Sequence, residues 1–216
     1  MFASIRRYRL NRGSTDELTR RVDQGFAEEV QNQPGFISYE FIDCGDGEIV
    51  TISLFGDASQ AEASRELAER WTAENLRDLV FVRMEVLHGE VCVSRADREM
   101  LEPAHARMMG KFASIRRYML RSGDVSELMH IVDDVFADQI RLMDGFEGYH
   151  ALECGPGEIL SISMFRDQTS AEASDERALE FVQEHLGGFD IERTEVIGGE
   201  VRVSRALSEL LEPAHA

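Results

Sequence analysis

His150, Arg7 and Arg117 are the side chains whose chemistry is best suited to catalysis. His150 could act as a base near neutral pH, because an unperturbed imidazole titrates at about pH 6.5. Arg7 and Arg117 could each hold a carboxylate or a phenolate, because the planar fork of guanidinium donors matches planar anions. The competing interpretation is structural: His150 is hydrogen-bonded or exposed without a catalytic role, and the arginines pair with glutamates of a neighbouring strand.

Aromatic side chains could form the walls of a pocket for a flat ligand. We predict that five aromatic residues and one glutamate contact this ligand: Tyr39, Tyr149, Glu40, Phe55, Phe165 and Trp71. The alternative is core packing, since each aromatic ring buries a large apolar area wherever it lies in a strand or helix.

The sequence predicts neither a metal site nor a bound cofactor. No two histidines have the i, i+4 or H-x-H spacing of metal ligands. The three cysteines, Cys44, Cys92 and Cys154, form no CxxC motif, and their odd number does not fit a disulfide framework. Walker, dinucleotide-binding and G-x-S-x-G motifs are also missing from the sequence.

The charge balance argues against nucleic acid and membrane partners. The chain has 216 residues, with 41 acidic and 23 basic side chains and a formal charge of -18. Phosphate backbones and anionic lipids attract clustered Lys and Arg, which this composition opposes. No run of 18 apolar residues occurs, and the first residues lack the order of a signal peptide. We therefore expect a cytoplasmic protein that binds a small molecule.

The chain contains two copies of one sequence repeat. Residues 2–106 match residues 112–216 at a constant offset of 110 residues, so that Phe2–Tyr8 returns as Phe112–Tyr118. A period of this length is close to the size of a small domain and indicates a tandem duplication. The predicted organisation is repeat 1 at residues 1–106, a linker at 107–111 and repeat 2 at 112–216. Because residues 99–106 reappear at 209–216, we expect this tail to dock on the fold in each repeat.

Each repeat shows the element order β-α-β-β-α-β. In repeat 1 the alternating, β-rich stretches predict strands at Phe2–Leu10, Phe36–Asp43, Glu48–Phe55 and Val82–Arg95. Capping-box patterns at residues 14–17 and 59–62 predict the starts of two helices. The first helix carries Leu18, Val22, Phe26 and Val30 at four-residue steps. Gly89, in the last strand, predicts a bulge or bend that uses a positive φ.

This order predicts an α+β fold of two ferredoxin-like repeats. In each, a four-stranded antiparallel sheet has both helices on one face. Both alternating sets of residues in Glu48–Phe55 are largely apolar, so the second face of the sheet also needs cover. We expect the open faces of the two sheets to cover one another.

At this point the sequence resembles the dimeric α+β barrel superfamily, and within it the domains grouped with antibiotic biosynthesis monooxygenases. The resemblance rests on the element order, on the pairs Gly35-Phe36 and Gly145-Phe146, and on the strand that runs through Phe55 into an acidic turn. Members of this superfamily usually form homodimers. The resemblance therefore implies a fused dimer, an intramolecular α+β barrel, and leaves further association open.

The resemblance also implies three kinds of function. Members include cofactor-independent oxygenases of aromatic, phenol- or quinol-like compounds, haem-degrading enzymes and binding proteins. Many have an aromatic residue, commonly Trp, at the end of the third strand and a His in the second helix; the corresponding places here hold Phe55 with Ser64 and Phe165 with Ser174. Losing the imidazole removes an axial haem ligand. We therefore expect a cofactor-free monooxygenase, with a non-catalytic ligand-binding or assembly protein as the alternative.

Overall fold

A computed structural model describes residues 1–104 and 110–216, and both repeats have the predicted element order. The elements of repeat 1 are β1 (Phe2–Arg12), α1 (Thr15–Arg21), η1 (Val22–Phe26), α2 (Ala27–Gln31), β2 (Phe36–Gly45), β3 (Glu48–Phe55), α3 (Ala58–Asn75), β4 (Val80–Ala96) and η2 (Arg98–Leu101). Those of repeat 2 are β5 (Phe112–Ser122), α4 (Val125–Ile131), η4 (Val132–Phe136), α5 (Ala137–Arg141), β6 (Phe146–Gly155), β7 (Glu158–Phe165), α6 (Gln168–His185), β8 (Asp190–Ala206) and η5 (Ser208–Leu211).

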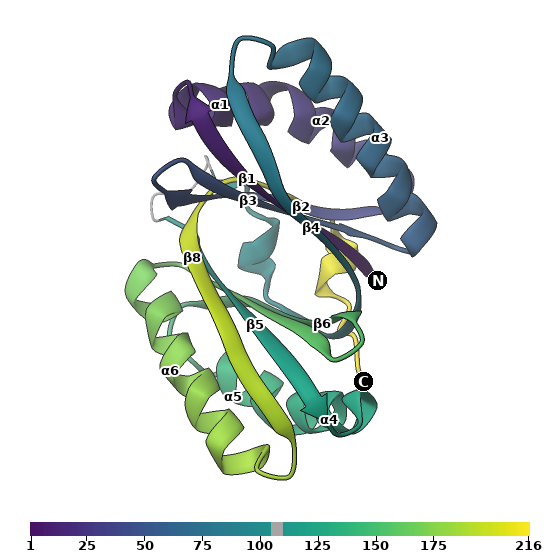
Figure 1. Cartoon of the computed structure of the whole chain (residues 1–216), viewed down its shortest axis with the longest axis vertical. Coiled ribbons are helices and arrows are strands. Elements are labelled where there is room, and N and C mark those ends of the chain that lie inside the picture. Colours follow the sequence, from purple (N-terminus) through teal and green to yellow (C-terminus); the bar gives the residue numbers. More distant parts are fainter. Residues whose placement is uncertain (105–109) are drawn as a thin grey trace.

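The eight strands close into one antiparallel barrel. Its strand order is β1-β3-β2-β8-β5-β7-β6-β4, so each repeat contributes a ferredoxin-like sheet. The two repeats join where β2 pairs with β8 and where β4 pairs with β6. The helices α1 to α3 cover the outer side of one sheet and α4 to α6 cover the outer side of the other (Figure 1). The predicted fold class, two repeats forming an internal dimeric α+β barrel, is confirmed.

Three apolar cores fill the space between these layers. In β3, Val50, Ile52 and Leu54 point into the barrel, whereas Ile49 and Phe55 point toward the helices. The two outer cores lie between each sheet and its own helices, and the third lies inside the barrel. Each sheet is therefore covered on both faces, as its two-sided apolar pattern predicted.

The first helix of each repeat contains a π-helical turn. Leu18, Val22, Phe26 and Val30 are all buried in one core, although a four-residue step overruns the 3.6-residue turn of an α-helix. The wider turn of η1 takes up this excess and keeps the four side chains on the sheet side. No helix of the described residues is long and apolar enough to cross a membrane.

Two local predictions need correction. The second helix begins earlier than expected, because its N-cap is Asp57 and not Ser59. The Asp57 carboxylate accepts from the backbone N–H of Gln60 at 2.9 Å, and the side-chain oxygen of Gln60 accepts from the backbone N–H of Asp57 at 3.1 Å. Gly89 does not have a positive φ. A Cβ there would lie 2.5 Å from the carbonyl oxygen of Glu153, so glycine permits β4 to approach β6 closely where it crosses to repeat 2.

The tails of both repeats contact the barrel. Met100 of η2 and Leu210 of η5 are buried in the barrel core. The backbone of Ala214 pairs with that of Ser94 in β4, on the other repeat. Most of the predicted linker, 107–111, lies outside the described residues, but Lys111 is described and is buried.

Candidate functional site

A cleft between the sheet and the helices of repeat 1 is the strongest candidate site; we call it cleft 1. It contains a cavity of about 60 Å³ between β1, β2 and β3 on one side and the helices on the other. Six aromatic side chains line it: Tyr8, Phe26, Tyr39, Phe41, Trp71 and Phe81. Tyr8 and Phe81 are half-buried and meet edge to face, with ring centroids 5.9 Å apart. An apolar, aromatic lining of this kind suits a flat organic ligand.

Trp71 of α3 is held in cleft 1 by its neighbours. Its ring lies 5.6 Å from that of Phe26, and Phe26 in turn meets Tyr39 edge to face at 5.3 Å. Gly25, in the π-helical turn, makes room for the indole: a Cβ at this position would lie 2.9 Å from Cζ2 of Trp71. The π-helical turn thus lets the first helix carry both the apolar stripe and the gap that receives Trp71.

The equivalent cleft of repeat 2 is smaller and less aromatic. Its cavity is about 30 Å³. At the places of Phe41, Phe81 and Trp71 it has smaller side chains, and at the place of Gly25 it has a valine: Ala151, Ile191, Phe181 and Val135. The two clefts have therefore diverged, and cleft 1 has the larger space and the more aromatic walls.

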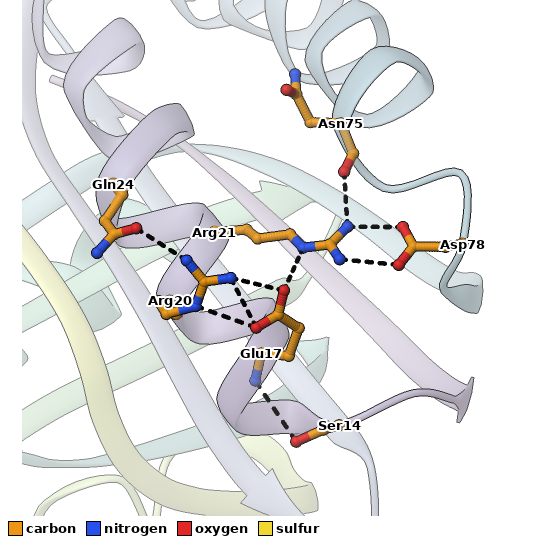
Figure 2. Close-up of polar contacts among 7 residues, drawn as sticks. All are labelled: Ser14, Glu17, Arg20, Arg21, Gln24, Asn75 and Asp78. Carbon is orange, nitrogen blue, oxygen red and sulfur yellow. Dashed lines mark hydrogen bonds and ion pairs between the residues drawn. The ribbon is translucent and has the colours of Figure 1, made fainter.

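A cluster of polar contacts joins α1 to the end of α3 and the turn that follows it in repeat 1 (Figure 2). Arg21 of α1 donates to both carboxylate oxygens of Asp78, at 2.6 and 2.8 Å, and to the carbonyl oxygen of Asn75 at 3.0 Å. Its Nε donates to Glu17 at 2.7 Å. Repeat 2 has Ile131 and Gly188 in place of Arg21 and Asp78, so it lacks this connection. The contacts tie α1 to the end of α3 in repeat 1 alone.

Arg6 is the charged member of the cleft lining, and it is not among the residues predicted from the sequence. Its side chain is buried, at 3% exposure, and burial lowers the pKa of its guanidinium. The signal was available: Arg6 has the same strand parity as Tyr8, whereas Arg7 has the opposite parity. Alternate residues of the strand face opposite sides of the sheet, and the side on which the helices pack decides which set faces the cleft.

Arg7 and Arg117 lie in the barrel, beside a small cavity between the two sheets. Arg7 donates to Glu195 of repeat 2 at 2.8 Å, and Arg117 donates to Glu85 of repeat 1 at 2.7 Å. Each arginine also pairs with a glutamate of its own repeat, Glu48 for Arg7. Their contacts link the repeats, and a catalytic role for either arginine stays a prediction.

His150 and Glu40 are also buried on barrel strands, at equivalent positions of β6 and β2. Nδ1 of His150 lies 3.0 Å from the hydroxyl of Ser94, and burial lowers the pKa of His150 to about 4. The carboxylate of Glu40 accepts from Ser38 at 3.3 Å, and burial raises the pKa of Glu40 to about 7. Neither side chain lines cleft 1, so their predicted roles stay predictions.

The predicted aromatic set is divided between packing and lining. Tyr39 and Trp71 both line cleft 1, and Tyr149 lines the cleft of repeat 2. Phe55 and Phe165 each pack edge to face on another phenylalanine in the outer cores, at 6.0 Å between centroids. The structure therefore brings together only part of this set.

The two clefts do not suit haem. At 60 and 30 Å³ their cavities are far smaller than a macrocycle. In the second helices, Ser64 and Ser174 occupy the places of the axial histidine implied by the resemblance, and their hydroxyls donate to Ala61 and Ala171 carbonyls. No histidine is among the described residues that line either cleft.

Comparisons with known proteins give one family match and several solved structures of similar fold. Residues 1–72 match the model of the antibiotic biosynthesis monooxygenase family. No curated protein matches the chain in sequence. Among solved structures, a protein of Fusobacterium nucleatum provisionally named a monooxygenase has a TM-score of 0.67 at 7% identity, over 99% of this chain and 94% of that one.

Two further solved structures have the same architecture. An anthrone oxidase-like protein has a TM-score of 0.57 at 11% identity, over 97% of this chain and 94% of its own. A heme-binding protein of Thermus thermophilus has a TM-score of 0.55 at 10% identity, over 93% and 90%. At such identities the likeness shows the fold alone. The chain is an internal dimeric α+β barrel, and residues 1–72 of its N-terminal repeat match the model of the antibiotic biosynthesis monooxygenase family.

Proposed function

We propose that the chain is a cofactor-independent oxygenase of phenol- or quinol-like aromatic compounds, with cleft 1 as its one substrate site. The aromatic lining of cleft 1 is the observation that carries this proposal. The family match at residues 1–72 falls on the same repeat and supports the assignment. Because the cavity of about 60 Å³ is smaller than the roughly 150 Å³ that holds benzene, the ring would also occupy the mouth beside the half-buried Tyr8 and Phe81.

The reaction needs no external reductant. A phenol with a free para position and O2 give a quinone and water: one oxygen atom forms the new carbonyl, the other leaves as water with the two displaced hydrogens, and the phenol supplies the electrons. A phenolate gives up electrons more readily than a phenol. The buried cation Arg6 would favour this anion, since charges attract more strongly away from water.

A non-catalytic ligand-binding protein is the alternative, and one observation favours it. None of the described residues that line cleft 1 is His, Asp, Glu or Cys, so the cleft offers no ordinary general base. Burial also raises the pKa of Tyr8 and Tyr39, which keeps their hydroxyls protonated at neutral pH. Turnover then requires a substrate that loses its proton without help from such a group.

The proposal includes a cytoplasmic location and a small-molecule partner, with neither nucleic acid nor membrane. All three cysteines are free thiols, as expected in a reducing compartment, and the net charge of -18 opposes binding to polyanions.

The test combines binding with oxygen consumption. Trp71 is the only tryptophan of the chain, so its fluorescence reports on cleft 1 alone. With 1-naphthol as the probe, the proposal expects a change in Trp71 fluorescence, oxygen uptake, and 1,4-naphthoquinone that carries one atom from ¹⁸O2. Phe41→Ala should weaken both signals, whereas Ile191→Ala in repeat 2 should leave them unchanged.

The outcomes separate the candidates. A fluorescence change without oxygen uptake, for 1-naphthol and a panel of quinols, would establish the binding protein instead. No change in fluorescence with any of these compounds would contradict the assignment of cleft 1.

A further inference from the structure

Repeat 2 shows what this fold does with the arginine equivalent to Arg6. Arg116 is fully buried, and its Nε donates to the carboxylate of Asp175 at 2.7 Å. The same carboxylate oxygen accepts from the hydroxyl of Ser114 at 2.5 Å. Ser161 and Ser163 accept from Nη1 at 3.2 and 2.9 Å, and Ser174 accepts from Nη2. The guanidinium thus has an internal carboxylate and a shell of hydroxyls.

Repeat 1 keeps the arginine and lacks the carboxylate. Nε and Nη2 of Arg6 are buried without a hydrogen-bond partner, and so are the hydroxyls of Ser4 and Ser53. Arg6 Nε and Ser4 are the equivalents of the two groups that hold Asp175 in repeat 2. The place of Asp175 itself is taken by Arg65, a residue of the same charge as Arg6.

The acidic side chains near Arg6 are committed elsewhere. Glu62 accepts from Arg65 Nη2 at 2.6 Å, and Glu69 accepts from Arg65 at 3.1 Å and from Arg83 at 3.3 Å. Both influence Arg6 only through space. A buried guanidinium without a paired anion is costly, because the protein does not replace the water that it loses.

We infer that cleft 1 binds a ligand that carries a carboxylate group, which pairs with Arg6 as Asp175 pairs with Arg116 in repeat 2. The inference rests on the proposed function only in using the same cleft. Arg6 is among the residues that line that cleft, so a ligand would approach it from the aromatic side; in repeat 2, Asp175 lines a different pocket together with Ser114. The carboxylate would supply the missing charge and accept from unpartnered donors, while the aromatic walls hold the rest of the ligand. Repeat 2 cannot serve in the same way, because Asp175 already neutralises its arginine.

Benzoate and its neutral isostere benzamide test the charge requirement. Each is titrated into the full chain at neutral pH, with Trp71 fluorescence and calorimetry as readouts. We expect benzoate to bind once per chain and at least tenfold more tightly than benzamide. Equal affinity for the two compounds, or no binding of benzoate, would overturn the inference. An equal response to inorganic phosphate would contradict the choice of a carboxylate.

Matched variants of the two repeats test the partner. Arg65→Asp gives repeat 1 the carboxylate of repeat 2, so it should weaken benzoate at least tenfold and leave benzamide unchanged. Asp175→Ala changes the equivalent position in repeat 2 and should leave the Trp71 response to benzoate unaltered. Circular dichroism checks that both variants fold. If both variants weaken benzoate equally, Arg6 is not its partner.

The results also distinguish this inference from the proposed function. Binding of 1-naphthol but not benzoate would remove the carboxylate and keep the aromatic site. Binding of benzoate without oxygen uptake on any phenol would keep the carboxylate site and remove the oxygenase.

Discussion

Replacing the two equivalent arginines by methionine should change stability in opposite directions. Arg116→Met removes the partner of Asp175, whose side chain remains only 25% exposed, and leaves a cluster of serines without their donor. Arg6→Met removes a buried cation that has no partner for two of its nitrogens. Methionine has a similar length and no charge, so both variants keep most of the packing.

The magnitudes follow from the burial of each charge. Removing one member of a buried ion pair costs about 3–5 kcal/mol, and the partial exposure of Asp175 places Arg116→Met near the lower end, at about 3 kcal/mol. Replacing a whole buried ion pair by apolar side chains is often neutral or stabilising by about 1–4 kcal/mol, and an unpaired buried charge has no attraction to lose, so Arg6→Met should be stabilising. At roughly 2–4 °C per kcal/mol for a chain of this size, Arg116→Met should lower Tm by about 6–12 °C, and Arg6→Met should raise it.

Thermal and urea unfolding of the ligand-free protein measure both changes. Benzoate should raise the Tm of the wild type and should lose that effect in Arg6→Met, because ligand binding stabilises only the form that binds. Equal destabilisation by the two substitutions would mean that Arg6 has structural partners as good as those of Arg116 and is not an unpaired charge.

Three further predictions concern other parts of the chain. Gly25→Val should push Trp71 toward the cavity, lower stability by about 1–3 kcal/mol and abolish the fluorescence response to 1-naphthol; an unchanged response would contradict the described fit. His150 has a pKa of about 4 when folded and about 6.5 when unfolded, so the free energy of unfolding should fall by about 3 kcal/mol as pH drops from 6.5 to 4. In urea titrations at the two pH values, the free energy of unfolding of His150→Gln should fall by less. An equal fall would show that His150 does not cause the pH dependence. Arg21→Ile introduces the residue of repeat 2 and breaks the contact with the largely exposed Asp78, so it should change the Tm little and show mainly as faster hydrogen exchange at the end of α3. A fall in Tm as large as that of Arg116→Met would show that the contact is part of the core.

The fold could be predicted because the pattern for β-α-β-β-α-β occurs twice in the sequence. The constant offset defined the repeat, and the apolar residues on both faces of β3 required a second sheet. The strand pairs that close the barrel, β2 with β8 and β4 with β6, could not be predicted from either repeat alone, because the apolar pattern of one strand does not identify its partner strand. For the same reason, the role of Gly89 was missed: the backbone that excludes a Cβ there belongs to the other repeat.

The candidate site was harder to predict because adjacent residues of a strand face opposite sides. Arg7 lies in the barrel and Arg6 in the cleft, and the shared alternation of Arg6 with Tyr8 distinguishes them only once the side on which the helices pack is known. The informative signal lay in the difference between repeats. Arg65 and Asp175 occupy equivalent places with opposite charges, which marks the one repeat whose buried arginine has an internal partner.

A crystal structure of the full chain with bound 4-bromobenzoate would show where an aromatic carboxylate binds. Anomalous scattering from bromine locates the ring independently of the surrounding side chains. We expect one bromine per chain at the aromatic walls of cleft 1, with the carboxylate within hydrogen-bond distance of Arg6. Bromine in the repeat 2 cleft, or a ring in cleft 1 with its carboxylate turned away from Arg6, would contradict this expectation.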